Sequence, residues 1–148
     1  RESPPVHSPI RLVLNWTHFD SAVTDATTNS YWKSTVVEPS VALLATLLAV
    51  NNPSSGDLVW NQPLCNLDWT STGSVANADT LLWVTADGSQ CSDSTLGFAY
   101  ACAQDATTGR PNFGTFNVCP SYLPPPSPAT AKKNRERLMF VTHEIYHA

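Results

Sequence analysis

The stretch Thr80-Leu81-Leu82-Trp83-Val84-Thr85 is a short, almost continuous run of apolar side chains. A strand that is exposed on one face alternates between apolar and polar residues, whereas a strand buried on both faces is apolar at successive positions. The run therefore predicts that residues 80–85 form an inner strand of a sheet.

Three further segments have the composition of strands, namely residues 10–14, 98–102 and 113–118. The last two are joined by Gly109-Arg110-Pro111, a sequence typical of a loop. The strands, together with the helices described next, predict an α+β fold in which helices back a small twisted mixed sheet.

Two segments have helical spacing. Residues 40–50 carry four leucines on one side, with Ser40 as the expected N-cap. A second helix is expected from Thr130, its N-cap, to Ala148, with apolar residues at Leu138, Val141, Ile145 and Ala148. Its basic cluster is expected to face water, and Met139 is expected in the core; the cluster comprises Lys132, Lys133, Arg135 and Arg137.

The remaining segments predict loops. Residues 1–9 contain three prolines and are interpreted as an extended lead-in, and residues 20–30 are polar. Residues 120–128 contain five prolines, which is typical of a polyproline-type loop and excludes both a helix and an inner strand. The sequence thus predicts one domain over residues 10–148.

Composition excludes several functions. A length of 148 residues suffices for one core, and a net charge of −4 opposes nucleic-acid binding. The longest apolar stretch, residues 41–50, is too short for a transmembrane segment, which needs about 20 residues. We therefore expect neither a nucleic-acid partner nor a membrane span.

Four cysteines lie at positions 65, 91, 102 and 119, and none has the close spacing of a zinc or redox motif. Disulfides are the favoured interpretation, and the spacing leaves all three connectivities open. Asn15-Trp16-Thr17 is a glycosylation sequon. Both features predict a secreted or cell-surface protein.

The last predicted helix contains His143-Glu144-Ile145-Tyr146-His147, the pattern H-E-x-x-H. Histidines four residues apart share one helix face, so both imidazoles can reach one Zn²⁺ ion, and the glutamate can act as general base. A chance match on a buried helix is the alternative. His7 and His18 are interpreted as ordinary surface histidines.

Residues 141–148 resemble the zinc helix of the leishmanolysin-like metallopeptidases, a branch of the metzincins. A second segment is similar to the same family, with Cys91, Ala99-Tyr100-Ala101-Cys102, Gly109-Arg110-Pro111 and Phe116-Asn117-Val118-Cys119-Pro120. Together these segments cover residues 80–148. The resemblance implies a metzincin-like N-terminal catalytic subdomain.

The resemblance further implies a zinc endopeptidase that acts on polypeptide substrates, with His143 and His147 as metal ligands and Glu144 as the general base. It implies that an edge strand aligns the substrate, which we expect at residues 113–118. It also implies two disulfides, Cys65 with Cys102 and Cys91 with Cys119.

The sequence departs from the family pattern because no third histidine ligand follows His147 within it. A catalytic zinc normally has three protein ligands. A C-terminal companion fragment that supplies the third histidine is one explanation, and further residues of the same polypeptide are another. Without a third ligand we expect this chain to be inactive. The alternative is a non-catalytic cell-wall or surface glycoprotein with a protease-derived scaffold.

Overall fold

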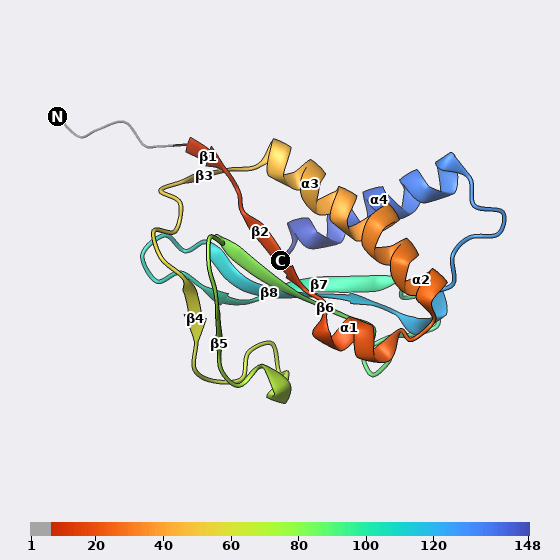
Figure 1. Ribbon diagram of the computed structural model, residues 1–148, viewed down its shortest axis with the longest axis horizontal. Coiled ribbons are helices and arrows are strands. Elements are labelled where there is room, and N and C mark those ends of the chain that lie inside the picture. Colours follow the sequence, from red (N-terminus) through yellow and green to blue (C-terminus); the bar gives the residue numbers. More distant parts are fainter. Residues whose placement is uncertain (1–6) are drawn as a thin grey trace.

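The computed structural model describes residues 7–148, which form a mixed α/β structure with one four-stranded and two two-stranded sheets. The larger sheet has the order β2-β6-β8-β7 (Figure 1). Strands β2, β6 and β8 are parallel, and β7 is antiparallel to β8. The strands are β1 (His7–Pro9), β2 (Leu12–Asn15), β3 (Ala49–Asn51), β4 (Leu58–Trp60), β5 (Gly73–Val75), β6 (Thr80–Thr85), β7 (Gly97–Gln104) and β8 (Pro111–Val118).

The strand β6 lies between β2 and β8, and all six of its residues are buried. This confirms the expectation of an inner strand. The structure corrects the expectation for residues 113–118, because β8 is paired on both sides and the edges of the sheet are β2 and β7. Residues 113–118 are buried throughout, which fits an inner rather than an edge position.

Helical structure covers more of the chain than the sequence predicts. It includes a single 3-10 turn, η3 (Pro120–Tyr122), in the proline-rich segment from which the sequence excludes a helix, because proline is tolerated in a first turn. The polar stretch 20–30 contributes to α1 and α2, and the π-helical turn η1 follows directly. Burial of Trp32, Val36 and Val37 holds η1 against the core, which compensates for its low helix propensity. The helices are α1 (Thr17–Ala22), α2 (Ala26–Ser30), η1 (Tyr31–Val37), α3 (Glu38–Leu47), η2 (Asp68–Thr70), η3 (Pro120–Tyr122) and α4 (Ala131–Tyr146).

The start of α3 corrects the predicted N-cap. Ser40 lies inside the helix and is buried, and its hydroxyl donates hydrogen bonds to the carbonyls of Val36 and Leu138. The second bond joins α3 to α4. The helix ends at Leu47, and the predicted last turn instead forms β3, which pairs with β1. Residues 7–9 of the expected extended lead-in therefore form a paired strand, whereas residues 1–6 lie outside the described residues.

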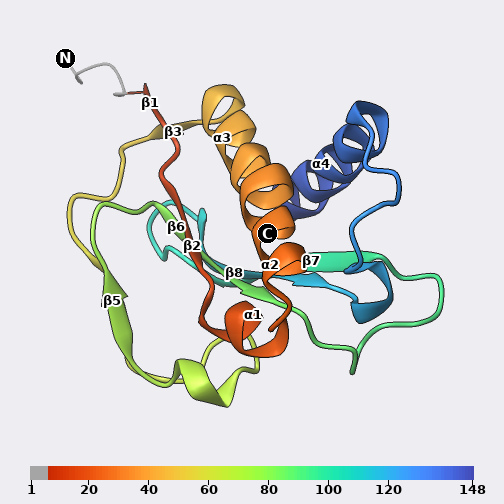
Figure 2. The same cartoon turned by 45° about the vertical axis from the view of Figure 1, so that its right-hand side comes forward.

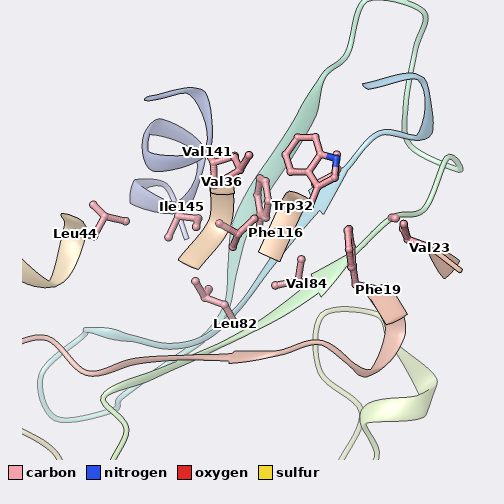
Figure 3. Close-up of a cluster of buried hydrophobic side chains, with 13 residues drawn as sticks. Phe19, Val23, Trp32, Val36, Leu44, Leu82, Val84, Phe116, Val141 and Ile145 are labelled. Carbon is pink, nitrogen blue, oxygen red and sulfur yellow. The ribbon is translucent and has the colours of Figure 1, made fainter. Parts of the chain in front are cut away.

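Two apolar clusters lie on opposite faces of the sheet. On one face α3 and α4 cover β6 and β8, as Figure 2 shows. Figure 3 shows Phe116 and Leu82 pointing into the cluster that also contains Trp32, Val36, Leu44 and Ile145. On the other face Trp60 packs edge-on against Trp83 and Phe113. Both faces of β6 are thus covered, which explains its unbroken apolar sequence.

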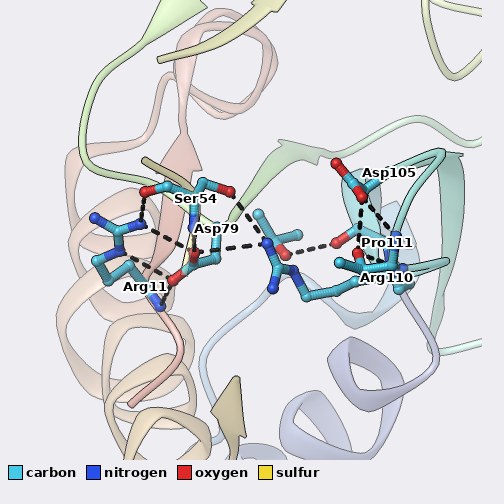
Figure 4. Close-up of polar contacts among 8 residues, drawn as sticks. Arg11, Ser54, Asp79, Asp105, Arg110 and Pro111 are labelled. Atoms are coloured by element: carbon cyan, nitrogen blue, oxygen red, sulfur yellow. Dashed lines mark hydrogen bonds and ion pairs between the residues drawn. The ribbon is translucent and has the colours of Figure 1, made fainter. Parts of the chain in front are cut away.

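Asp79 joins the amino-terminal ends of the three parallel strands (Figure 4). Its buried carboxylate accepts hydrogen bonds from the Arg11 backbone and guanidinium at 3.0 Å and from the Ser54 backbone at 2.8 Å. Arg110, directly before β8, places a guanidinium nitrogen 3.7 Å from it. Burial acts to raise the pKa of Asp79, but the hydrogen bonds from Arg11 and Ser54 lower it by more. The resulting pKa is about 2, below the usual value.

Two disulfides join distant segments, Cys65 to Cys102 and Cys91 to Cys119. This is the pairing that the family resemblance implies. The first attaches the segment before η2 to β7, and the second attaches the end of β8 to the loop that follows β6. No helix within residues 7–148 is long and apolar enough to span a membrane.

Candidate metal centre

The helix α4 is fixed at both ends. The Thr130 hydroxyl accepts a hydrogen bond from the Lys133 backbone, as the sequence predicts for an N-cap. At the other end Val141 and Ile145 are buried against the sheet. A methyl group on Gly114 of β8 would lie 3.2 Å from Cβ of Ala148, so the absence of a side chain at Gly114 lets the last turn approach β8 (Figure 1).

The structure brings together the two histidines of the H-E-x-x-H pattern. The Nε2 atoms of His143 and His147 are 3.2 Å apart, and both residues are exposed. Two nitrogens that bind one tetrahedral Zn²⁺ at 2.0–2.1 Å lie about 3.3 Å apart. The separation therefore fits shared coordination of one ion, and without an ion it also permits a hydrogen bond between the rings.

Glu144 lies between the two histidines in sequence and is half-buried. Within residues 7–148 its carboxylate has no hydrogen-bond or ion-pair partner. A glutamate that is not committed to an ion pair is available to accept a proton from a nearby water molecule.

The side of α4 that carries the histidines also faces β7. Phe140, His143 and His147 share one helix side because their spacing is three and four residues. A methyl group on Gly97, the first residue of β7, would lie 3.3 Å from the Phe140 ring. Since β7 is an edge strand, this places a strand with unpaired backbone groups on the histidine side of the helix.

The donor set is incomplete in the part of the chain that the structure describes. No group of three histidine, cysteine, aspartate or glutamate side chains within residues 7–148 can hold a metal ion together. His7 is exposed in β1, as expected, whereas His18 corrects the surface interpretation, because it is half-buried and stacks on Trp69. The four cysteines are all in disulfides. Two imidazoles fit zinc by chemistry and spacing, and the described residues place no third protein donor beside them.

Arg137 corrects the expectation that the basic cluster faces water. The side chain is buried, its Nη2 donates a 2.9 Å hydrogen bond to the Pro124 carbonyl, and its guanidinium lies 4.3 Å from the Tyr122 ring centroid. It also lies 5.3 Å from the ring of Trp32. Arg137 therefore holds the proline-rich loop and η1 against α4. The other three basic residues are exposed, as expected.

Sequence reasoning missed this role of Arg137, although a signal was present. Arg137, Val141 and Ile145 follow one another at intervals of four residues, so Arg137 continues the apolar stripe of α4. Met139 is also corrected, because it lies on the outer side of α4 and is 54% exposed rather than in the core.

Neither a scan of protein-family models nor a search of curated protein sequences finds a match for this chain. The functional assignment therefore depends on the chemistry of the residues described above.

Proposed function

We propose that this chain is the part of a secreted, leishmanolysin-like zinc endopeptidase that carries the zinc helix, with residues 10–148 as a metzincin-like N-terminal subdomain. The observation that carries the proposal is the 3.2 Å separation of the His143 and His147 Nε2 atoms, which matches two ligands of one tetrahedral ion. The family resemblance of the second segment, which runs from Cys91 to Pro120 and lies outside the zinc helix, also supports it.

His143 and His147 would hold the zinc ion, and a companion polypeptide would supply the third histidine. When bound, zinc supplies Lewis-acid polarisation of the scissile carbonyl and lowers the pKa of a bound water. Glu144 takes the proton of the attacking water and delivers it to the departing amine. Its half-buried carboxylate, which has no competing partner within residues 7–148, suits this transfer.

The substrate would bind in extended form along the free edge of β7, rather than along β8 as the sequence predicts. Strand addition uses unpaired backbone groups at a sheet edge, and β8 has none because it is paired with β6 and β7. Of the two edge strands, β7 is the one on the histidine side of α4.

A secreted location is supported by the two disulfides, which form and persist in oxidising compartments. We propose that Asn15 carries a glycan. Asn15 pairs in register with Trp83, whose side chain packs on the sheet face opposite α4. A glycan there would not obstruct the histidine pair.

The proposal is tested by zinc content and by cleavage of an unfolded protein, with and without a companion polypeptide that carries a further histidine. We expect Glu144→Gln to bind zinc like the wild type but to lose cleavage, by a factor on the order of 10² to 10⁴. The matched control is Glu136→Gln, an exposed glutamate on the same helix, which should cleave normally. Equal cleavage by Glu144→Gln and the wild type would exclude the proposed role.

A second candidate function is a non-catalytic surface glycoprotein on a protease-derived scaffold. It is favoured by the incomplete donor set within residues 7–148. In that case no companion polypeptide would restore cleavage, and zinc would be absent from the purified protein.

A further inference from the structure

A cavity of about 130 Å³ lies on the face of the sheet opposite α3 and α4. It is placed at the carboxyl ends of the parallel strands, where Thr85 ends β6 and Asn117 lies near the end of β8. His18, soon after β2, and Asp87, just after β6, contribute to its wall. Carboxyl ends of parallel strands commonly form ligand sites, since the loops that follow them converge there.

Hydrogen bonds hold the wall of this cavity in one arrangement. Buried Asn117 donates to the Asp87 carbonyl at 2.9 Å and accepts from the Asp87 backbone at 2.8 Å and from the Thr85 hydroxyl at 2.7 Å. One Asp87 carboxylate oxygen accepts from the Ser89 backbone at 2.8 Å. Cys65, which also lines the cavity, is bonded to Cys102 of β7 by a disulfide. The cavity is therefore preformed rather than a gap between mobile loops.

Two polar groups in the wall have unused hydrogen-bonding capacity. Nδ1 of His18 is buried and has no partner among the described residues, while the imidazole ring stacks on Trp69 at 5.4 Å. Asp87 is exposed, and its carboxylate, which accepts hydrogen bonds from Ser89, has lone pairs left for a further donor, so His18 contributes the only buried atom of this pair. A buried polar atom without a partner is unfavourable and is normally satisfied by water or a ligand.

The chemistry of the lining selects the ligand class. No lysine or arginine lines the cavity, so a bound anion would have no counter-charge there. A metal ion is also disfavoured, because His18 and Asp87 alone provide too few ligands to hold one. Asn66, Ser89 and Gln90 add donors and acceptors at its wall, and Phe98 adds an apolar surface. This combination suits a small neutral ring that carries several hydroxyl groups.

We propose that this cavity binds a single sugar residue, with one hydroxyl donating to the Asp87 carboxylate and another bonded to Nδ1 of His18. A hydroxyl that donates to a carboxylate forms a charge-assisted hydrogen bond, which is stronger than one between neutral groups. The site lies on the opposite face of the sheet from His143 and His147, and it does not depend on the zinc site.

The test is titration of the chain with N-acetylglucosamine, glucose and galactose, followed by saturation-transfer NMR. Asp87→Asn keeps an oxygen for the Ser89 amide but removes the charge, and His18→Phe keeps the ring on Trp69 but removes both nitrogens. We expect saturable binding of at least one sugar, weakened at least about tenfold in each variant. Asp93→Asn and His7→Phe, both exposed and outside the cavity, should bind like the wild type.

Amide spectra of each variant establish that it is folded. Absence of binding by all three sugars, or equal binding by both cavity variants and the wild type, would overturn the proposal. Binding of lysine amide in place of the sugars would also overturn it, because the cavity would then be a cation site. Tighter binding of a glycan-bearing peptide than of the free sugar would support the proposal and identify a protein-linked glycan as the ligand. Equal affinity for the peptide and the free sugar would support the proposal and identify a free saccharide as the ligand.

Discussion

Asp79 is the residue whose charge matters most to the fold, because its carboxylate is buried between two arginines at the start of β2, β6 and β8. Its pKa of about 2 in the folded protein lies below the usual 3.8. The ionised Asp79 carboxylate therefore stabilises the fold fully at pH values above the pKa of this group in the unfolded chain. This contribution to the free energy of unfolding is lost as the pH falls from about 4 to about 2. The shift corresponds to about 2 kcal/mol.

We predict that Asp79→Asn lowers the free energy of unfolding by about 2 to 4 kcal/mol at neutral pH, because two arginines lose their counter-charge. Urea unfolding at several pH values measures this. The wild type should lose stability between pH 4 and 2 more steeply than the variant. Asp57→Asn, an exposed position, is the control. Parallel pH profiles for Asp79→Asn and the wild type would contradict the assignment.

Arg137 is the second residue with a specific role, since its guanidinium contacts Tyr122 and Trp32 and bonds the Pro124 carbonyl. Arg137→Met keeps the apolar stem but loses the charge and the hydrogen bond. We predict a loss of about 1 to 3 kcal/mol in the free energy of unfolding. Arg135→Met, exposed on the same helix, should change stability little, so equal effects of the two variants would refute this role.

At the scale of elements, the close approach of α4 to β8 depends on Gly114. A methyl group there would lie 2.9 Å from a Leu82 methyl and 3.1 Å from the Tyr100 carbonyl oxygen. We predict that Gly114→Ala destabilises the fold by about 1 to 3 kcal/mol and shifts the amide signals of the last turn of α4. Gly56→Ala meets nothing within 4 Å and is the matched control. A neutral Gly114→Ala variant would show that the helix end does not rest on the sheet as described.

The strands could be predicted from the sequence better than the helices. Strand β6 is recognisable because burial on both faces requires apolar residues at most positions, and β8 is recognisable by Phe113, Phe116 and Val118 although it also carries polar residues. The helical segment 17–37 could not be found, because its turns are mostly polar or β-branched and are held by the burial of a few side chains, namely Phe19, Trp32, Val36 and Val37. The edge position of β7 could also not be predicted from the sequence, because the order of strands in a sheet depends on pairing between distant segments.

For the candidate site, the sequence pattern identified His143, Glu144 and His147, because a helix fixes the spacing of residues four apart. It did not identify Arg137 or Gly114 as the residues that position α4. It also gave no indication of the cavity beside Asp87, whose walls come from segments that are far apart in the chain.

At the scale of the whole molecule, the disulfides join segments separated by 37 and 28 residues. On the chain-entropy model each contributes about 3.5 to 4 kcal/mol to the free energy of unfolding. We predict that replacing Cys91 and Cys119 together by alanine lowers the midpoint of denaturant unfolding accordingly. The same midpoint with and without this disulfide would contradict its stabilising role.

The central claim is that His143 and His147 bind one zinc ion together. The most direct test is to titrate the chain with Zn²⁺ and to follow the imidazole resonances by NMR. The signals of both histidines should shift together with one apparent Kd, and those of His7 and His18 should stay in place. His143→Gln should abolish the shift of His147. Independent shifts of the two rings, or none while the chain remains folded, would contradict the claim.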